Sequence, residues 1–136
     1  MGLVGRLRLE LIDPWPTPSP ESVAEGERFV AKIAEYAEAH IDNAQIERDA
    51  FIPDDVLRGL ADLGAFGMKI DKKYGGLGLS THGYCQALTM LASANSSVSA
   101  LLSAHQSIGV PQPLKLFGTE EQKSRFLPRL AAGEIS

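Results

Sequence analysis

The sequence predicts an all-α fold, an irregular bundle-like packing of about six helices joined by short loops. Along most of the chain, apolar residues recur at spacings of three and four, which places them on one face of a helix. Capping and turn residues separate these stretches, and no internal repeat or confident sheet is predicted. We expect the helices near residues 20–48, 54–63, 81–94, 97–108, 112–117 and 120–132.

Composition limits what the chain can be. At 136 residues it can bury one core, and 44% apolar with 22% charged residues is ordinary for a soluble globular protein. The net charge of -4 argues against a nucleic-acid partner, and no apolar run is long enough to span a bilayer. The single cysteine, Cys85, excludes an internal disulfide, fits a reducing compartment and is predicted to be a buried thiol.

Residues 1–19 are interpreted as a proline-rich N-terminal extension, and residues 20–136 as the helical domain. Met1–Leu11 lacks the apolar core of a signal peptide, and a vestigial transit segment stays open as an alternative. For Trp15 we favour packing against the start of the first helix over a stacking role.

The first two helices have clear start signals. Ser19 is the expected N-cap of the first, with Pro20 at its first position, and Pro53 precedes the second. Gly64 is expected to end the second helix. The predicted inward residues of the two helices are Val30, Ile33, Ala34, Ala37, Ile41, Ala44, Val56, Leu57, Leu60 and Leu63.

A glycine-rich segment follows within residues 66–79, which are predicted as a loop or short extended piece. Gly75, Gly76 and Gly78 permit tight turns with positive φ. A phosphate cradle is the alternative, but the preceding buried strand and the Lys-Ser/Thr pair of a P-loop are missing. We therefore favour a structural turn.

The third helix is capped by Ser80 or Thr81 and interrupted at Asn95, after which Ser96 caps the fourth. The third helix is expected to turn Tyr84, Leu88, Leu91 and Ala92 inward. One face of the fourth helix carries Val98, Leu101, Leu102, His105 and Ile108.

Prolines and caps divide the remainder of the chain. Pro111 and Pro113 prevent the fourth helix from continuing smoothly, and Gly118 suits a left-handed helix end. Thr119 and Gln122 form a predicted capping box for the last helix. Gly133 ends that helix, and Pro128 should kink or restart it.

An apolar cluster is expected around the prolines, formed by Ile108, Val110, Leu114, Leu116 and Phe117. If it is exposed, the isolated chain should self-associate, and polar residues in place of Leu102 and Leu116 should reduce association. If the cluster folds inward, the same changes should unfold the domain.

Few residues suggest chemistry. The three histidines lack metal-ligand spacing, and no serine lies in a nucleophile elbow. The acidic pairs at 54–55 and 120–121 fall in first helical turns, where the helix dipole explains them. His105 is either a core histidine bonded to a backbone carbonyl or part of a ligand pocket. The residues alone indicate a helical domain without a complete active site.

Four motifs in order resemble the N-terminal helical domain of the acyl-CoA dehydrogenases. They are Leu63-Gly-Ala-Phe-Gly67, Lys73-Tyr-Gly-Gly-Leu-Gly-Leu79, Gly118-Thr-Glu-Glu-Gln-Lys123 and Phe126-Leu-Pro-Arg-Leu-Ala-Ala-Gly-Glu134. The run Ala104-His-Gln-Ser-Ile-Gly109 is similar to the very-long-chain branch. The resemblance covers roughly residues 28–136.

The resemblance implies a role in fatty-acid β-oxidation, where the complete FAD-dependent enzyme oxidises acyl-CoA to trans-2-enoyl-CoA. In the family the glutamate base and most flavin contacts lie outside this domain. We therefore expect no catalytic residue here, no activity of the 136-residue chain alone and no retained FAD. The domain's helices would line the fatty-acyl cavity, and the implied substrate-binding positions are Leu101, Leu102, Ser103, His105 and Gln106.

The resemblance also implies a long-chain fatty acyl-CoA substrate, electron-transfer flavoprotein as partner and a homo-oligomeric complete enzyme. The expected location is the bacterial cytoplasm, with the mitochondrial matrix or an inner-membrane-associated position as alternatives. Two other functions stay open: a non-catalytic helical interaction module left from an enzyme, and an acyl-CoA oxidase.

Overall fold

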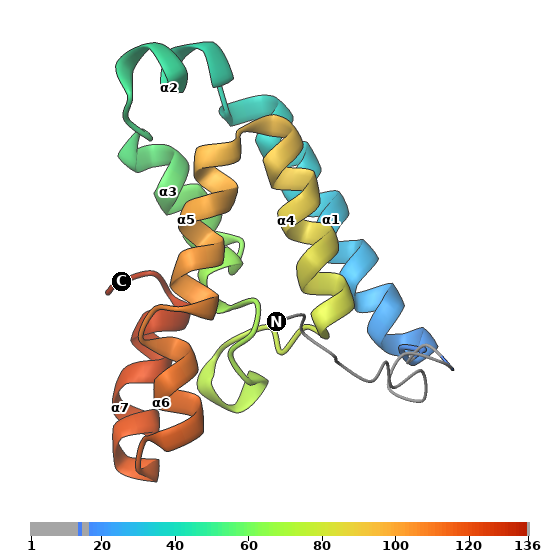
Figure 1. Cartoon of the computed structure of the whole chain (residues 1–136), viewed down its shortest axis with the longest axis vertical. Helices are drawn as coiled ribbons and strands as arrows, with labels where there is room; N and C mark the ends of the chain where they lie inside the picture. Colours follow the sequence, from blue (N-terminus) through green and yellow to red (C-terminus); the bar gives the residue numbers. More distant parts are fainter. Residues whose placement is uncertain (1–13, 15–16, 136) are drawn as a thin grey trace, which may run out of the picture.

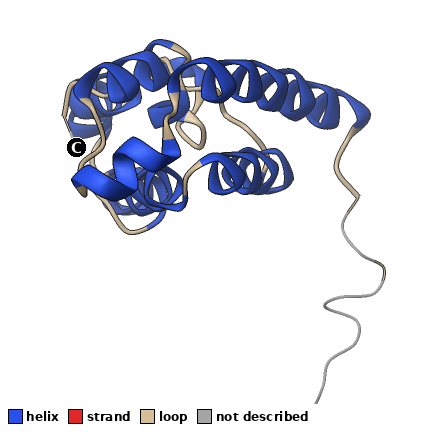
Figure 2. Ribbon diagram, turned by 90° about the horizontal axis from the view of Figure 1, so that it is seen from above, coloured by secondary structure: helices blue, strands red, loops and turns tan. Residues whose placement is uncertain are grey.

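The computed structural model describes residue 14 and residues 17–135 (Figure 1). The expectations for Met1–Leu11 and Trp15 lie outside the described residues. Within them the chain is helical and contains no strand, which confirms the all-α prediction (Figure 2). The helices are α1 (Pro20–His40), α2 (Asn43–Asp49), α3 (Asp54–Asp62), α4 (Thr81–Ala94), α5 (Ser96–Ser107), α6 (Pro111–Phe117) and α7 (Glu120–Ala131), with 3-10 turns η2 (Ala65–Gly67) and η3 (Lys72–Tyr74).

The predicted helix at 20–48 was wrong, because it is two helices. Ile41 adopts an extended conformation, and the Asp42 side chain accepts a hydrogen bond from the backbone N–H of Gln45 at 3.0 Å. Asp42 thus caps a new helix, α2, which turns away from α1 (Figure 1). As a result Ala44, expected on the inward stripe, is exposed.

The main core lies where α1, α3, α4 and α5 meet. Helices α1 and α4 lie side by side (Figure 1) and approach closely at two glycines. A Cβ atom at Gly26 would lie 2.9 Å from the Cα of Gly83, so a side chain there would push the helices apart. The buried members of this core are Phe29, Ile33, Ile46, Val56, Leu60, Ala65, Phe66, Met68, Tyr84, Ala87, Leu91, Val98 and Leu102.

A second, smaller core joins α7 to the loop before α4. It contains Ile70, Tyr74, Leu127, Leu130 and Ala131. The Tyr74 hydroxyl donates to Glu120 at 3.0 Å, which ties η3 to the first turn of α7. The two cores are connected through residues 65–70, because this segment contributes to both.

The glycine-rich segment is a packed turn. Gly75 and Gly78 have the expected positive φ values of 81° and 59°. Gly76 does not, but a Cβ atom there would lie 2.1 Å from the carbonyl oxygen of Ile70. Its backbone is pressed against other backbone, so the segment offers no open phosphate cradle.

Local end signals were predicted with mixed success. The capping box of Thr119 and Gln122 is present, and Gly64 and Gly133 have positive φ after α3 and α7. Asn95 caps α5 instead of Ser96, because its side chain accepts from the N–H of Val98. Gly118 is extended, with φ -70° and ψ 151°, instead of left-handed.

Helix α7 continues through Pro128, so of the two outcomes expected there, a kink or a restart, the restart does not occur. Two further predictions were wrong. Ala92 and Cys85 are exposed, because α4 buries the face that carries Tyr84, Ala87 and Leu91.

No described helix combines the length and apolar character needed to cross a membrane.

Candidate functional site

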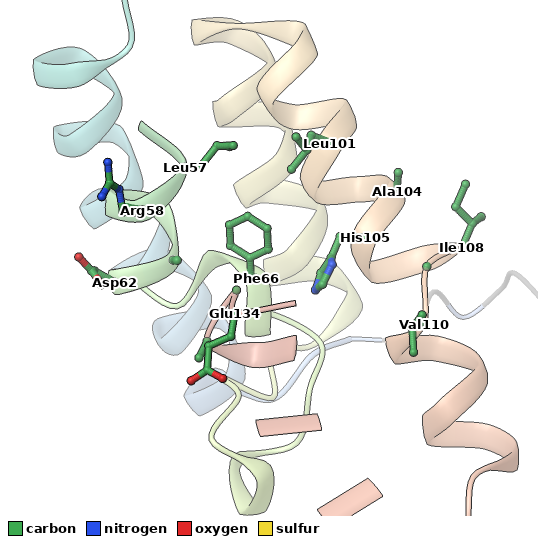
Figure 3. Close-up of a pocket in the computed structure, with 14 residues that line it drawn as sticks. Leu57, Arg58, Asp62, Phe66, Leu101, Ala104, His105, Ile108, Val110 and Glu134 are labelled. Atoms are coloured by element: carbon green, nitrogen blue, oxygen red, sulfur yellow. The ribbon is translucent and has the colours of Figure 1, made fainter. Parts of the chain in front are cut away.

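An apolar cavity of about 650 Å³ lies between α3, η2, α5 and the end of α7 (Figure 3). Its walls are formed largely by apolar side chains from these segments. Arg58 and Asp62 lie on the α3 side, Glu134 lies below Phe66, and Ile108 and Val110 lie at the opposite side (Figure 3). The remaining lining residues are Leu57, Ala61, Phe66, Leu101, Ala104, His105, Gly109, Ala132 and Gly133.

Two rings form the centre of this cavity. Phe66 comes from η2 and His105 from α5, and their ring centroids are 5.2 Å apart in an edge-to-face arrangement. Both side chains are buried, with exposed fractions of 5% and 8%. Because Phe66 and His105 are about forty positions apart in the chain, this contact fixes two distant segments at the cavity wall.

His105 is both a core residue and a lining residue, so its two sequence interpretations are compatible. Burial lowers the pKa of His105 below its ordinary value of 6.5, and the nearby carbonyls of Leu130 and Phe66 oppose this shift. Its Nε2 atom is buried and has no hydrogen-bond partner within the described part of the chain. The neutral imidazole therefore suits an apolar cavity better than the cation does.

We expect acid to destabilise the chain through His105. Because its pKa is lower in the folded state, the unfolded chain binds the proton first as pH falls below about 6.5. The stability is complete above that pH and is lost as pH decreases toward the folded pKa, with a slope of at most about 1.4 kcal/mol per pH unit. Glu25 and Glu120 also have lowered pKa values, but the ordinary pKa of these carboxyl groups is 4.5, so they change the stability only at more acidic pH.

Urea unfolding at pH values of about 7.5 and 5.5 tests this expectation. His105→Gln should flatten the pH dependence between these values, because it removes the buried titrating group. His82→Gln is the matched control, since His82 is exposed. An unchanged slope in His105→Gln would contradict the prediction.

The structure places only two of the five predicted substrate-binding residues at this cavity. Leu101 and His105 line it. Leu102 is fully buried in the main core. Ser103 faces the Tyr84 hydroxyl at 3.5 Å, and Gln106 binds backbone groups of the 65–69 segment.

Several lining residues were not predicted as site residues, above all Phe66. It lies within the motif Leu63-Gly-Ala-Phe-Gly67, but an irregular turn has no periodicity that would indicate a direction for its side chain. Ile108 was assigned to the inward face, yet it is 81% exposed at the cavity's edge, because α5 ends at Ser107.

A second apolar cavity of about 490 Å³ lies on the other side of Leu57 and Leu101, which line both cavities. Exposed Phe51 forms part of its wall. Leu57 and Leu101 therefore separate the two apolar spaces.

Among the described residues, no group of three or more His, Cys, Asp or Glu could hold a metal ion.

Comparison with known proteins gives a consistent picture. Residues 24–134 match the family model for the acyl-CoA dehydrogenase N-terminal domain. The chain is 54% identical over 133 residues to probable acyl-CoA dehydrogenase FadE10 of Mycobacterium tuberculosis, covering 98% of this chain and 20% of that protein. It is 35% identical over 131 residues to mouse mitochondrial very long-chain specific acyl-CoA dehydrogenase, covering 96% of this chain and 20% of that protein.

Two solved structures share the fold. A chain of the electron transferring flavoprotein of Acidaminococcus fermentans has a TM-score of 0.71 at 24% identity, covering 86% of this chain and 30% of that one. The prolyl acyl carrier protein oxidase AnaB has a TM-score of 0.66 at 25% identity, covering 86% and 31%. The chain spans about a fifth of the length of the curated relatives named above. Together with the all-helical fold, the match over residues 24–134 shows that this chain belongs to the acyl-CoA dehydrogenase family and corresponds to its N-terminal domain.

Proposed function

We propose that this chain forms one wall of the fatty-acyl cavity of an acyl-CoA dehydrogenase of fatty-acid β-oxidation. The observation that carries the proposal is the apolar cavity that is lined by α3, η2, α5 and the end of α7. Such walls favour alkyl chains, since burying one methylene contributes about 0.8 kcal/mol. A long-chain acyl-CoA is the substrate class that these walls suit best.

Oxidation to the trans-2-enoyl product would require the complete enzyme. FAD supplies hydride acceptance when it is bound. The described residues do not fit the cofactor by themselves: Gly76 of the glycine turn is packed against the backbone of Ile70, and the charged residues of the cavity lining are one cation, Arg58, and two carboxylates, Asp62 and Glu134. We accordingly assign this chain acyl-chain contacts and no step of the oxidation.

The partners and location follow from the same proposal. The complete enzyme would be a homo-oligomer that passes electrons to electron-transfer flavoprotein. Curated relatives are mycobacterial and mitochondrial, so we place the enzyme in the bacterial cytoplasm, with the mitochondrial matrix or inner membrane as alternatives.

Filling part of the cavity should weaken acyl binding without unfolding the chain. Ala104 lines the cavity and is exposed, so Ala104→Trp places an indole in the acyl space at little cost in stability. Excluding two methylenes costs about 1.6 kcal/mol, so we expect at least about a tenfold loss of affinity for hexadecanoyl-CoA. Calorimetric titration below the micelle concentration measures this.

Ala100→Trp provides the matched control. Ala100 is exposed one turn earlier on α5 and does not line the cavity, so its affinity should equal that of the wild type. Equal affinities of the wild type and Ala104→Trp would refute the proposed site.

Two alternatives each have an observation in their favour. An interaction module is favoured by the exposed apolar side chains around α6, namely Ile108, Val110, Leu116 and Phe117. An acyl-CoA oxidase is favoured by the fold shared with the acyl carrier protein oxidase. Oxygen consumption by the complete enzyme separates an oxidase from a dehydrogenase.

A further inference from the structure

Gln106 follows His105 in sequence but does not line the cavity. It is 1% exposed on the buried face of α5. Its side-chain amide donates to the carbonyl oxygen of Ala65 at 2.6 Å, and its Oε1 accepts from the N–H of Lys69 at 2.9 Å. Both ends of one amide therefore bind the backbone of a single turn, at residues 65–69.

That turn is buried and irregular. Ala65, Phe66, Gly67 and Met68 are all buried, so their backbone polar groups need partners within the protein. Gly67 is also tightly packed, since a Cβ atom there would lie 3.1 Å from both Gly76 and Ala131. The position of this turn therefore depends on the groups that bind its backbone and pack against it.

The turn carries the Phe66 ring into the cavity. His105 contacts that ring edge to face, while its neighbour Gln106 holds the backbone on either side of it. Two consecutive residues of α5 thus act on the same wall, one by contact and one through the backbone. The Lys115 side chain of α6 donates to the carbonyl oxygen of Lys69, which adds a further hydrogen bond at the end of the turn.

We infer that Gln106 is a positioning residue that fixes the Phe66 wall and thereby sets which acyl chains the cavity accepts. The inference rests on the proposed function for its substrate class. It differs from a purely stabilising role, because that role would change the unfolding free energy and leave the cavity of the folded chain as it is.

Gln106→Glu tests the inference on the 136-residue chain. At neutral pH a carboxylate would face the Ala65 carbonyl and lose the donated bond, so the turn should shift. We expect altered NMR resonances of the His105 ring and about a fourfold smaller ratio of hexadecanoyl-CoA to dodecanoyl-CoA affinity, equivalent to the contacts of one methylene. At acidic pH the protonated carboxyl can donate again, so both readouts should return toward those of the wild type at that pH.

Asn95→Asp is the matched control. Asn95 is 1% exposed at the other end of α5, and its amide donates to Asn43 and accepts from the N–H of Val98. The same exchange of amide for carboxyl there should change stability but neither the His105 resonances nor the affinity ratio. Gln106→Asn, one methylene too short to reach both backbone groups, serves as second variant should Gln106→Glu not fold.

Folded Gln106 variants with wild-type His105 resonances and affinity ratio would overturn the inference. A wild-type chain that does not discriminate between the two acyl chains would instead overturn the proposed function. In that case the His105 resonances still decide whether Gln106 fixes Phe66.

Discussion

Replacing Ile108 and Phe117 by serine is expected to convert a self-associating chain into a monomer. Four large apolar side chains around the α5–α6 corner are exposed, with Ile108 at 81% and Phe117 at 85%. Contiguous apolar patches of about 300–600 Å² are the largest that soluble monomers usually tolerate. We therefore expect association at concentrations of about tens of micromolar for the wild type and its loss in the double variant.

Sedimentation velocity with circular dichroism distinguishes surface from core effects. Leu102→Ser is the contrast, since Leu102 is fully buried and its truncation should cost about 2–5 kcal/mol of unfolding free energy. The double serine variant should keep its helix content, whereas Leu102→Ser should lose it. A wild-type chain that sediments as a monodisperse monomer would contradict this prediction.

The sequence had grouped Leu102 with Leu116 as members of one surface. Leu116 is 62% exposed and Leu102 is fully buried, so the two belong to different environments. Of the expected proline cluster, only Leu114 packs inward, against the second core. The alternative in which the whole cluster folds back is therefore wrong.

Helix ends were predictable where local side-chain chemistry decides them. The Thr119–Gln122 capping box and the Gly133 terminus depend on residues within one turn, and both were found as expected. The break at Asp42 was missed because Ile41 continues the apolar stripe of α1, and this pattern concealed the capping signal. Helix α6 ends at Gly118 in an extended conformation. Any residue can adopt this conformation, so the glycine alone did not indicate how the helix ends.

The candidate site was predictable only along α5. Helical spacing placed Leu101 and His105 on a shared face, and both line the cavity. Phe66 depends on an irregular turn whose direction is fixed by Gln106 from forty residues away, which sequence spacing cannot indicate. The relation between Gln106 and Phe66 depends on how α5 packs against η2, so it can be recognised only in the folded structure.

The affinity of the chain for acyl-CoA is expected to increase steeply with the length of the acyl chain. If the cavity between α3, α5 and α7 accepts the alkyl chain, affinity must increase with each methylene that enters it. At about 0.8 kcal/mol each, the four methylenes between dodecanoyl-CoA and hexadecanoyl-CoA contribute up to about a 200-fold increase. The rest of the molecule is common to both ligands, so the ratio isolates the alkyl contacts.

Titration of the wild-type chain with octanoyl-, dodecanoyl- and hexadecanoyl-CoA, each below its micelle concentration, measures this ratio. Competition by CoA alone gives the contribution of the head group. The proposed function predicts an affinity that increases with chain length for the wild type and Ala100→Trp, and a hexadecanoyl-CoA affinity at least about tenfold lower for Ala104→Trp. Equal affinities for all three acyl chains in the wild type would contradict the assignment of this domain to an acyl-chain wall.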